Sequence, residues 1–536
     1  MSAENAARIC KRLSDLKGKR QVHEQVWRDC FELTFPLRAH GFNGNVVDAQ
    51  QAQNQKARIQ DSTGTQASQV LASSIMSGLT PANSRWFELD VDGETPDDKR
   101  YLDNAAETIW LNIHQSNFDA EGYEACLDTV AAGWFALYVD EDRERGGYSF
   151  EQWPIAGVYI TSSRRDGLVD TCYREHSMPA RTAAETFGLE NLSEGTQKLA
   201  REKPDELVSF IHAIEPRTPY VVGARMAKNL PFASYVVESK GKQLVRESGY
   251  HEFPVIAPRW QRIPDTSYGV GPVFDALPDI RVLNELKALQ LASADVAVGG
   301  MWVAEDDGVF NPRTAKLGAR KILIASSTDA IKPLQTGANF QLADFMVNDL
   351  KASIRKILMA DQLQPQDGPA MTATEVHVRV EMIRQLLGPI YGRLQAEYLR
   401  PLIERCFGIA YRAGILGEPP ESLAGRDYSV RYVSPMARAQ RLEEVTATQR
   451  LYETAGLISQ AKGGDMAIFD RLNDDAALEI AADGLGVPSK VMLSDTEMQA
   501  KLDARTQAAE QAKQQQMGEQ AIAMSAQAQT QQAAAA

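Results

Sequence analysis

The chain has 536 residues, of which 44% are hydrophobic and 24% are charged. A chain of this length exceeds the size at which one hydrophobic core stops growing, so we expect two to four structural units, and the composition excludes wholesale disorder. The formal net charge of −14 argues against a broad basic surface that grips nucleic acid, because such a surface needs clustered Lys and Arg.

The cysteines and the N-terminus indicate the cellular compartment in which the protein folds. Five cysteines are scattered without a CxxC pair, which predicts neither a disulfide framework nor a zinc site and is typical of a reducing cytosol. The N-terminus carries basic residues but no apolar signal-peptide core. No apolar run approaches the roughly 18 residues that a membrane span needs. We therefore expect neither secretion nor a membrane segment.

The first part of the chain is predominantly helical in pattern. Apolar residues at helical spacing mark the helices. Polar runs rich in Gln, Asn and Gly, and prolines at the ends of segments, mark the boundaries between elements. In chain order the sequence predicts a helix over 4–33, a polar loop over 41–57, a helix rich in small side chains over 67–79, a strand at 86–89 and a helix over 97–116.

From Trp134 the pattern changes to the alternation of strands, broken by the turn signals Gly146-Gly147 and Arg165-Asp166-Gly167. A single helix is expected over 180–201. Together these elements predict an α+β domain over 134–263 with an antiparallel sheet. The expected strands lie at 134–139, 148–153, 158–160, 168–175, 207–215, 232–239, 243–248 and 253–261.

Two long helices then flank a small insert. The first has Pro278 in its first turn, where the missing N–H costs nothing, and continues to Gly299-Gly300; the second covers 340–360. The insert, 301–336, has candidate strands at 301–305, 321–327 and 331–336. Its basic patch either contacts a partner or is an ordinary solvated face, and consists of Arg313, Lys316, Arg320 and Lys321.

The next stretch, 361–407, begins as a polar loop and becomes a long helix. Thr372 and Glu375 have the spacing of a capping box, which fixes the helix start. Pro389 and Pro401 predict a bent rod or two rods in line. The polar loop contains Gln362, Gln364, Gln366 and Asp367, and the apolar stripe of the helix contains Val376, Val380, Ile383, Leu387, Ile390 and Leu394.

The C-terminal part is helical again. The sequence predicts a strand at 428–433, a helix over 435–462 and short helices up to residue 488. From residue 496 the chain is rich in Gln and Ala. These residues favour helix, but with few large apolar groups the tail should fray unless copies pack together.

Motifs of known enzymes are missing. There is no GxxxxGK[ST] loop, no complete HExxH, no GxSxG and no dinucleotide fingerprint after a strand. The pairs Asp306-Asp307 and Asp474-Asp475 could ligate a metal, but no further ligand stands at a suitable spacing. The seven histidines do not cluster. The sequence therefore favours a protein that is not an enzyme and holds no cofactor or metal.

Six strings resemble, in family order, the portal or head-to-tail connector proteins of short-tailed bacteriophages (podovirus type), and the resemblance covers nearly the whole chain. They are SQVLASSIMSGLTPANSRWFEL (68–89), RRDGLVDTCYRE (164–175), GVGPVFDALPDIRVLNEL (269–286), the MTATEV helix with EYLRPLIERC (371–406), YVSPMARAQR (432–441) and the Gln/Ala-rich end.

The resemblance implies a mostly helical α+β fold that assembles into a ring, usually a dodecamer, around a central channel. The implied parts are a wing (1–263), a first stem helix (264–300), a clip (301–336), a second stem helix (337–360), a tunnel loop (361–371), a long kinked helix with a wing strand (372–434), a crown (435–495) and a Gln/Ala-rich tail (496–536).

The resemblance also implies partners and a location. Double-stranded DNA would pass the tunnel loop residues Gln362, Gln364, Gln366 and Asp367, which offer polar contact with little phosphate attraction. The clip patch would dock the terminase motor during packaging and tail adaptor or tube proteins afterwards. The ring would contact major capsid and scaffolding proteins at the capsid portal vertex of the virion, after assembly in the host cytoplasm.

Two other classes of function stay open. One is a soluble phage-encoded nucleic-acid hydrolase, for which Asp306 and Asp307 would be the residues to mutate. The other is a helical scaffold or adaptor protein that is absent from the mature particle.

Overall fold

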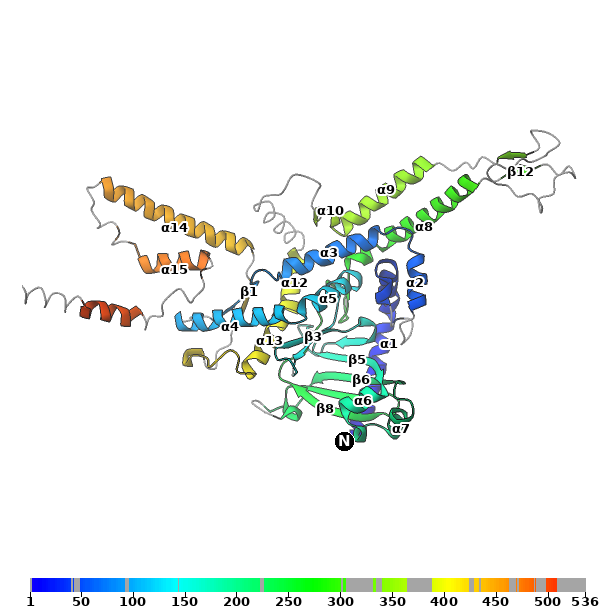
Figure 1. Cartoon of the computed structure of the whole chain (residues 1–536), viewed down its shortest axis with the longest axis horizontal. Coiled ribbons are helices and arrows are strands. Elements are labelled where there is room, and N and C mark those ends of the chain that lie inside the picture. Colours follow the sequence, from blue (N-terminus) through cyan, green and yellow to red (C-terminus); the bar gives the residue numbers. More distant parts are fainter. Residues whose placement is uncertain are drawn as a thin grey trace, which may run out of the picture. The chain divides into compact units, whose positions relative to one another are not determined.

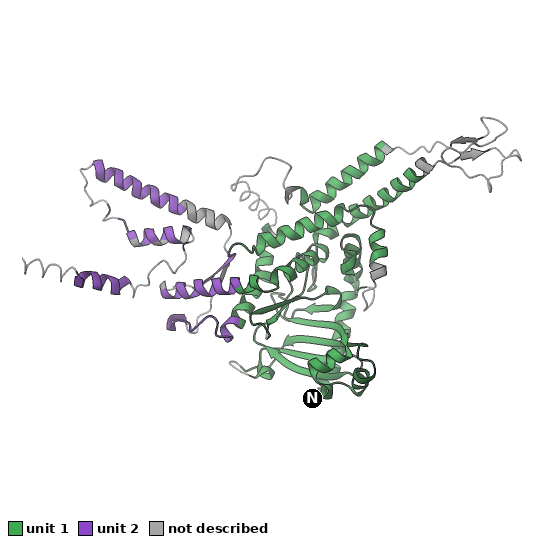
Figure 2. Ribbon diagram, in the orientation of Figure 1, with its two compact units in different colours: residues 1–84, 112–409 green, residues 85–111, 410–536 purple. Residues whose placement is uncertain are grey.

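The computed structural model describes most of the chain (Figure 1). Residue contacts divide the chain into two units, 1–84 with 112–409 and 85–111 with 410–536 (Figure 2). Helices predominate and sheets accompany them, so the predicted α+β class with mostly helical content is confirmed. The described residues are 2–39, 42, 49–91, 96–142, 144–221, 226–299, 302–304, 331–333, 340–363, 388–423, 429–432, 435–461, 469, 472–485, 487 and 498–508.

The first unit contains a five-stranded sheet in the order β4-β5-β6-β7-β8, in which every neighbouring pair is antiparallel. Successive side chains point to opposite faces of the sheet, and in β7 every residue from Ala233 to Glu238 is buried, so both faces of this strand are covered. The strands are β4 (Val158–Thr161), β5 (Thr171–Pro179), β6 (Leu207–Pro216), β7 (Phe232–Glu238) and β8 (Gln243–Tyr250).

Helices cover both faces of this sheet. The predicted N-terminal helix is α1 (Ser2–Thr34), and its Ile9 and Leu13 pack against Tyr173 on one face. On the other face lie α6 (Ala180–Phe187) and α7 (Glu194–Glu202). The single helix predicted over 180–201 is therefore wrong: Gly188, at φ +83°, ends α6, and the Ser193 side chain caps α7.

A second sheet has the order β3-β2-β9 and lies beside a buried helix, α5 (Phe118–Ala132). The sequence did not predict α5. Every residue from Ala125 to Ala132 is buried, so the helix lacks the polar face that would mark it as amphipathic. The strands are β2 (Leu137–Glu141), β3 (Tyr148–Gln152) and β9 (Val255–Ile256), and α3 (Thr63–Leu79) packs on α5.

Three further predictions need correction. A helix, α2 (Ala49–Ala57), occupies the second half of the predicted loop 41–57, since its Ala, Gln and Lys favour helix. The first long helix, α8 (Pro272–Gly299), begins at Pro272, so Pro278 lies in its interior and not in its first turn. The polar loop does not begin at Asp361, because α10 (Ala360–Leu363) continues the helical region.

The second long helix and the described part of the later rod agree with the sequence, whereas the predicted helix start at Thr372 and Glu375 and its stripe up to Leu387 lie outside the described residues. The second long helix is α9 (Phe340–Ile357), and the later rod consists of α12 (Gly388–Leu394), a π-helical turn (Gln395–Leu399) and α13 (Arg400–Arg412). The rod is irregular immediately before Pro401, which has no N–H to continue the α-helical ladder. In the insert, β12 (Trp302–Ala304) pairs antiparallel with β13 (Ile331–Pro333).

The second unit has its own small sheet and helices. Strand β1 (Phe87–Asp90) pairs antiparallel with β14 (Ser429–Tyr432), and both agree with the predicted strands. Most of α4 (Pro96–Gln115) belongs to this unit, together with α14 (Pro435–Ala461) and α15 (Asp474–Leu485). Tyr452 on α14 donates a hydrogen bond to Asp474 on α15 at 2.6 Å. Within the described ranges, no helix combines the length and apolarity needed to cross a bilayer.

The start of α8 is held by a close crossing of backbones. Gly133, at φ +81°, ends α5, and a Cβ there would lie 1.9 Å from the carbonyl carbon of Val270. A Cβ on Gly271 would lie 2.5 Å from the Val130 oxygen. Only glycine permits this approach, so the 259–271 segment, which leads into α8, is fixed on the end of α5.

Aromatic rings and hydrogen bonds complete this junction. Trp260 N donates to Gly133 O at 2.8 Å, and the indole Nε1 of Trp27 donates to Gly269 O at 3.2 Å. The rings of Trp27, Trp134 and Tyr268 lie with centroids 5.2 to 5.5 Å apart, in tilted or edge-on contact. The junction therefore ties α1, α5 and α8 to one another.

The crossing predicts a large difference between two glycine substitutions. Gly133→Ala should destabilise the protein by roughly 3 kcal/mol or more, because it combines a left-handed backbone with a steric clash. Gly18→Ala, inside α1 with no atom within 4 Å of the new Cβ, should stabilise it by roughly 0.5–1 kcal/mol. Urea unfolding followed by tryptophan fluorescence measures both; equal effects would contradict the proposed role of the crossing.

Candidate functional site

The candidate site is the pair of long helices α8 and α9, with the segments that hold them. Within the first unit the two helices lie side by side and run antiparallel (Figure 1). Gln290 Nε2 donates to Asp344 Oδ1 at 2.6 Å, and Ser353 Oγ donates to Asp279 Oδ2 at 2.7 Å. These two bonds fix the axial register of the two helices, that is, which residues of α8 lie level with which residues of α9.

The N-terminal half of α8 is bound to α1 and to residues 58–60, which precede α3. Arg281 forms an ion pair with Asp29 of α1 at 2.5 Å. Asn284 donates to Arg58 O at 3.0 Å and accepts from Gln60 N at 2.6 Å, so one amide satisfies the backbone of a loop from both sides. This half of α8 is therefore anchored by polar contacts in addition to its buried apolar face.

Helix α9 is anchored at the same end by Lys351, whose ammonium lies 2.8 Å from Asp61. The Asp61 carboxylate also accepts from Thr63 N at 2.9 Å and from Thr63 Oγ1 at 2.5 Å, where α3 begins. Burial alone would raise the pKa of Asp61, but the bonds from Lys351 and Thr63 outweigh it and the pKa lies below its ordinary value. The carboxylate stays charged and links α9 to α3.

The chain turns sharply between α9 and α10. Met359, between them, has φ +57°, a left-handed backbone that a side chain rarely adopts. Leu358 and Ala360 on either side of it are buried, and α10 packs on α3 and α9. Packing therefore holds the turn, and with it the point at which the chain enters 364–387.

The rod that begins at Gly388 is held by a buried ion pair. Arg259 is 1% exposed and donates to the Glu397 carboxylate through Nε at 2.9 Å and Nη2 at 2.7 Å, while its backbone N donates at 3.0 Å. Glu397 lies in the π-helical turn. Arg393, one turn earlier, donates to Trp260 O at 2.9 Å. The rod is thereby fixed to the 259–271 segment.

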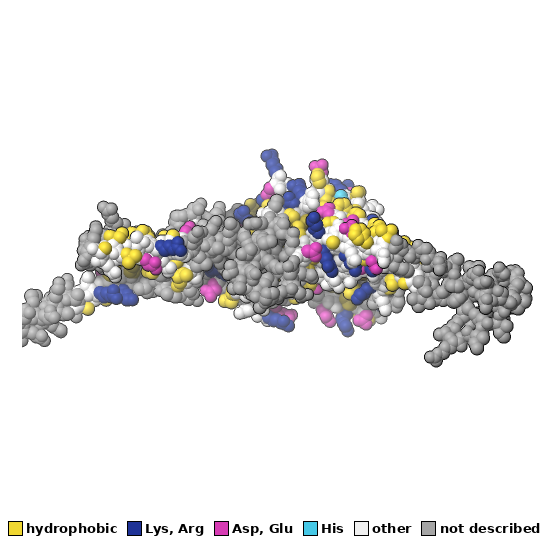
Figure 3. Space-filling model, turned by 90° about the horizontal axis from the view of Figure 1, so that it is seen from above, with side chains coloured by type: hydrophobic (Ala, Val, Ile, Leu, Met, Phe, Trp, Pro, Cys, Tyr) yellow, Lys and Arg dark blue, Asp and Glu magenta, His cyan; other side chains and the backbone are white. Residues whose placement is uncertain are grey.

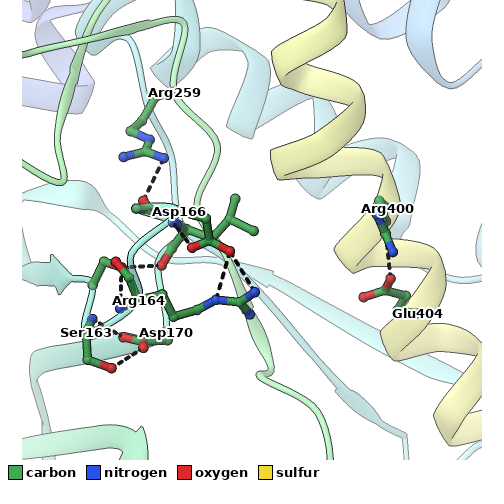
Figure 4. A network of polar contacts seen from close by, with 10 residues as sticks. Ser163, Arg164, Asp166, Asp170, Arg259, Arg400 and Glu404 are labelled. Carbon is green, nitrogen blue, oxygen red and sulfur yellow. Dashed lines mark hydrogen bonds and ion pairs between the residues drawn. The ribbon is translucent and has the colours of Figure 1, made fainter.

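Arg259 also reaches a third part of the chain (Figure 4). Its Nη2 donates to Gly167 O at 2.9 Å, in the turn that the sequence predicts from Arg165-Asp166-Gly167. That turn is closed by the ion pair of Arg164 with Asp166 at 2.7 Å and by hydrogen bonds from Ser163 to Asp170. One guanidinium therefore joins the sheet domain to the rod.

Two histidines of the sheet domain are buried. Burial lowers the pKa of His212 to about 3 and that of His176 to about 4, so both rings are neutral at pH 7. His212 Nε2 lies 2.9 Å from Ser234 Oγ, and its ring lies beside Trp153 and Tyr138. These contacts suit a structural role. Among the described residues, no group of three His, Cys, Asp or Glu is placed to hold a metal ion.

The structure describes only one of the predicted site residues. Gln362 lies in α10, whereas Gln364, Gln366 and Asp367 lie outside the described residues. The basic patch also lies outside them, namely Arg313, Lys316, Arg320 and Lys321, and so do Asp306 and Asp307. Sequence reasoning missed the pairs Arg259–Glu397 and Lys351–Asp61, whose members are far apart in the chain and belong to no local motif.

Comparison with known proteins shows the family of the chain. A sequence model of the family described as "Bacteriophage head to tail connecting protein" matches residues 6–493. The chain belongs to this family of phage connector proteins. The predicted resemblance to portal proteins is thereby confirmed.

The chain aligns with individual relatives over most of their length. It is 30% identical to the "Portal protein" of Salmonella phage epsilon15 over 97% of this chain and 94% of the relative. It is 28% identical to the "Probable portal protein" of Bordetella phage BPP-1 over 90% and 88% of the two chains. Identity to the "Portal protein" of Escherichia phage T7 is 21%, over 72% and 71%.

The ion pair that anchors the rod yields a stability prediction. Glu397→Gln should destabilise the protein by about 3 kcal/mol, because it leaves the Arg259 guanidinium buried without a counter-charge. The control is Glu404→Gln, which removes the exposed pair of Arg400 with Glu404 on α13 (Figure 4) and should cost less than about 0.5 kcal/mol. Denaturant unfolding measures both, and a Glu397→Gln value as small as that of the control would refute the anchoring role.

Proposed function

We propose that this chain is a portal protein whose copies form a ring-shaped channel at one capsid vertex, usually with twelve subunits. Double-stranded DNA would be packaged through the ring by the terminase and later ejected, and tail proteins would attach to it. Support comes from membership of the connector family over residues 6–493 and from portal relatives that align along nearly the whole chain. Connector proteins are structural, and neither the family nor these relatives are named for a catalytic activity.

The observation that carries the proposal is the anchored helix pair. Helices α8 and α9 are bound at one end to the sheet domain through Arg281–Asp29 and Lys351–Asp61, and the insert connects their other ends. A rigid antiparallel pair of this kind suits a wall element that must keep its place while DNA moves. In this proposal α8 and α9 are the stem and 301–336 is the clip.

The other parts follow in the same proposal. Residues 1–263 form the wing, 372–434 the long kinked helix and wing strand, 435–495 the crown and 496–536 the tail. The clip residues Arg313, Lys316, Arg320 and Lys321 dock the terminase and later the tail adaptor or tube proteins. Major capsid and scaffolding proteins surround the ring in the assembled virion, and assembly takes place in the host cytoplasm.

The tunnel loop, 361–371, is proposed to face DNA. Its first residues, 361–363, lie in α10, which packs on α3 and α9, and the rod that starts at Gly388, further along the chain, is fixed to the 259–271 segment. A polar loop in a protein of net charge −14 would contact DNA without binding it tightly.

Electron microscopy tests the ring directly. Purified protein in negative stain should show annular particles with a central hole in end-on views, since heterologous contacts that close by rotation produce rings. A monodisperse monomer under all conditions of salt and concentration would overturn the proposal.

The tunnel loop has its own test. Deleting Gln364 to Gly368 should leave ring assembly intact and reduce the amount of DNA packaged in a terminase-driven assay, because the contact at the constriction is lost. A deletion of equal length in the tail, Gln511 to Gln515, serves as the control and should package normally. Normal packaging by the loop deletion would remove the loop from the channel.

A further inference from the structure

We infer that the ring contains a seam in which the outer face of α8 of one copy packs antiparallel on the outer face of α9 of the next, with Leu289 opposite Phe345. This inference rests on the proposed ring and specifies which faces meet and in which register. It follows from three features of the pair: two exposed stripes, their directions, and their matching heights.

The first stripe runs along α8 and is uncovered in the single chain. Its members recur at steps of four and three, the spacing of a helix seam, and all are exposed. Leu289 is 65% exposed and Val282 45%. The stripe is mainly apolar and consists of Phe274, Pro278, Val282, Glu285, Leu289 and Ala292.

The second stripe runs along α9 with the same alternation of four and three. Phe345, at 70% exposure, is its largest apolar side chain. Hydrophobic side chains lie at the surface over α8 and α9 in the view of Figure 3. The stripe consists of Gln341, Phe345, Asn348, Ala352 and Arg355, all exposed.

The two stripes point away from the side on which each helix is buried. On α8, at 100° per residue, the buried Ile280 lies half a turn from Leu289 and the buried Leu283 a third of a turn from it; on α9, Val347 and Ile354 lie about half a turn from Phe345. The pair therefore offers two different outer surfaces. Repeated contact between two different surfaces is heterologous and closes into a ring when the rotation permits it.

The heights of the two stripes match. The bonds Gln290–Asp344 and Asp279–Ser353 show which residues of α8 and α9 lie level in one chain. Rotation about the ring axis keeps these levels when the pair lies along that axis. Leu289 then lies level with Phe345 of the next copy, Glu285 with Asn348, Val282 with Ala352 and Pro278 with Arg355. The steps between these levels are 4, 3 and 4 residues on α8 and 3, 4 and 3 on α9, so the two stripes stay within one residue of each other over four levels.

The chemistry of the stripes favours a second copy over other occupants. Large apolar groups such as Leu289 and Phe345 gain by burial against each other, and the Asn348 amide can donate to the Glu285 carboxylate at the next level. The charges of Glu285 and Arg355 within the stripes do not suit lipid. Asp344 and Asp349 beside Phe345 would repel the phosphates of DNA.

Cysteine crosslinking of full-length protein tests the register. Leu289→Cys with Phe345→Cys in one chain should give, on mild oxidation, a ladder of covalent multimers up to the full ring on a non-reducing gel. Val282→Cys with Ala352→Cys is a second pair in register and should behave in the same way. The wild type should give no ladder, because its five free cysteines are buried or, for Cys10, half-buried.

The matched control combines residues from the same two faces out of register. Leu289→Cys with Ala352→Cys displaces one partner by seven residues, roughly 10 Å along the helix, beyond the reach of a disulfide. It should give no ladder. If all variants form rings in negative stain and neither in-register pair crosslinks, or the control crosslinks as well as they do, the inferred seam is wrong while the ring stands. Absence of rings from the wild type itself would instead overturn the proposed function and the seam with it.

Discussion

The position of the helix pair depends on one steric constraint, the crossing of two backbones where α5 ends and α8 begins. At Gly133 and Gly271 there is no room for a Cβ. The same 259–271 segment carries Trp260, which donates to Gly133 O, and Arg259, which binds Glu397. A single stretch of chain therefore sets the origin of α8 and holds the rod after residue 387. A change at this junction would be transmitted to both.

The anchoring is electrostatic at the points where the chain has to hold helices that are remote in sequence. Lys351–Asp61 joins α9 to α3, and Arg259–Glu397 joins the rod to the sheet domain. In the second pair, where both partners are largely buried, breaking the contact is costly, so the pair fixes geometry more than it adds net stability. For a channel wall this is suitable, because a passing polymer exerts force on the wall while the wall must not bind the polymer tightly.

Much of the fold could be predicted from the sequence because a helix with one polar and one apolar face shows apolar residues at helical spacing. Helices α1, α9 and α14 have such faces and were expected close to their observed bounds. Helix α5 was missed because its second half, from Ala125 to Ala132, is buried on all sides, and the 180–201 region was misjudged because Gly188 was not recognised as a break. The Arg259–Glu397 pair spans 138 residues, and nothing local marks either partner. The polar loop and the basic patch were found from composition, but their roles were assigned from the resemblance, and these roles remain predictions.

The central claim, a ring with α8 and α9 at its wall, is tested most directly by cryo-electron microscopy of the unique vertex of mature virions, reconstructed without imposed icosahedral symmetry. We expect a ring of this chain at that vertex, with α8 of each copy packed on α9 of the next around a central channel that contains DNA. A vertex without this chain, as expected for a scaffold protein that leaves the particle, or a ring in which α8 and α9 lie away from the channel, would contradict it.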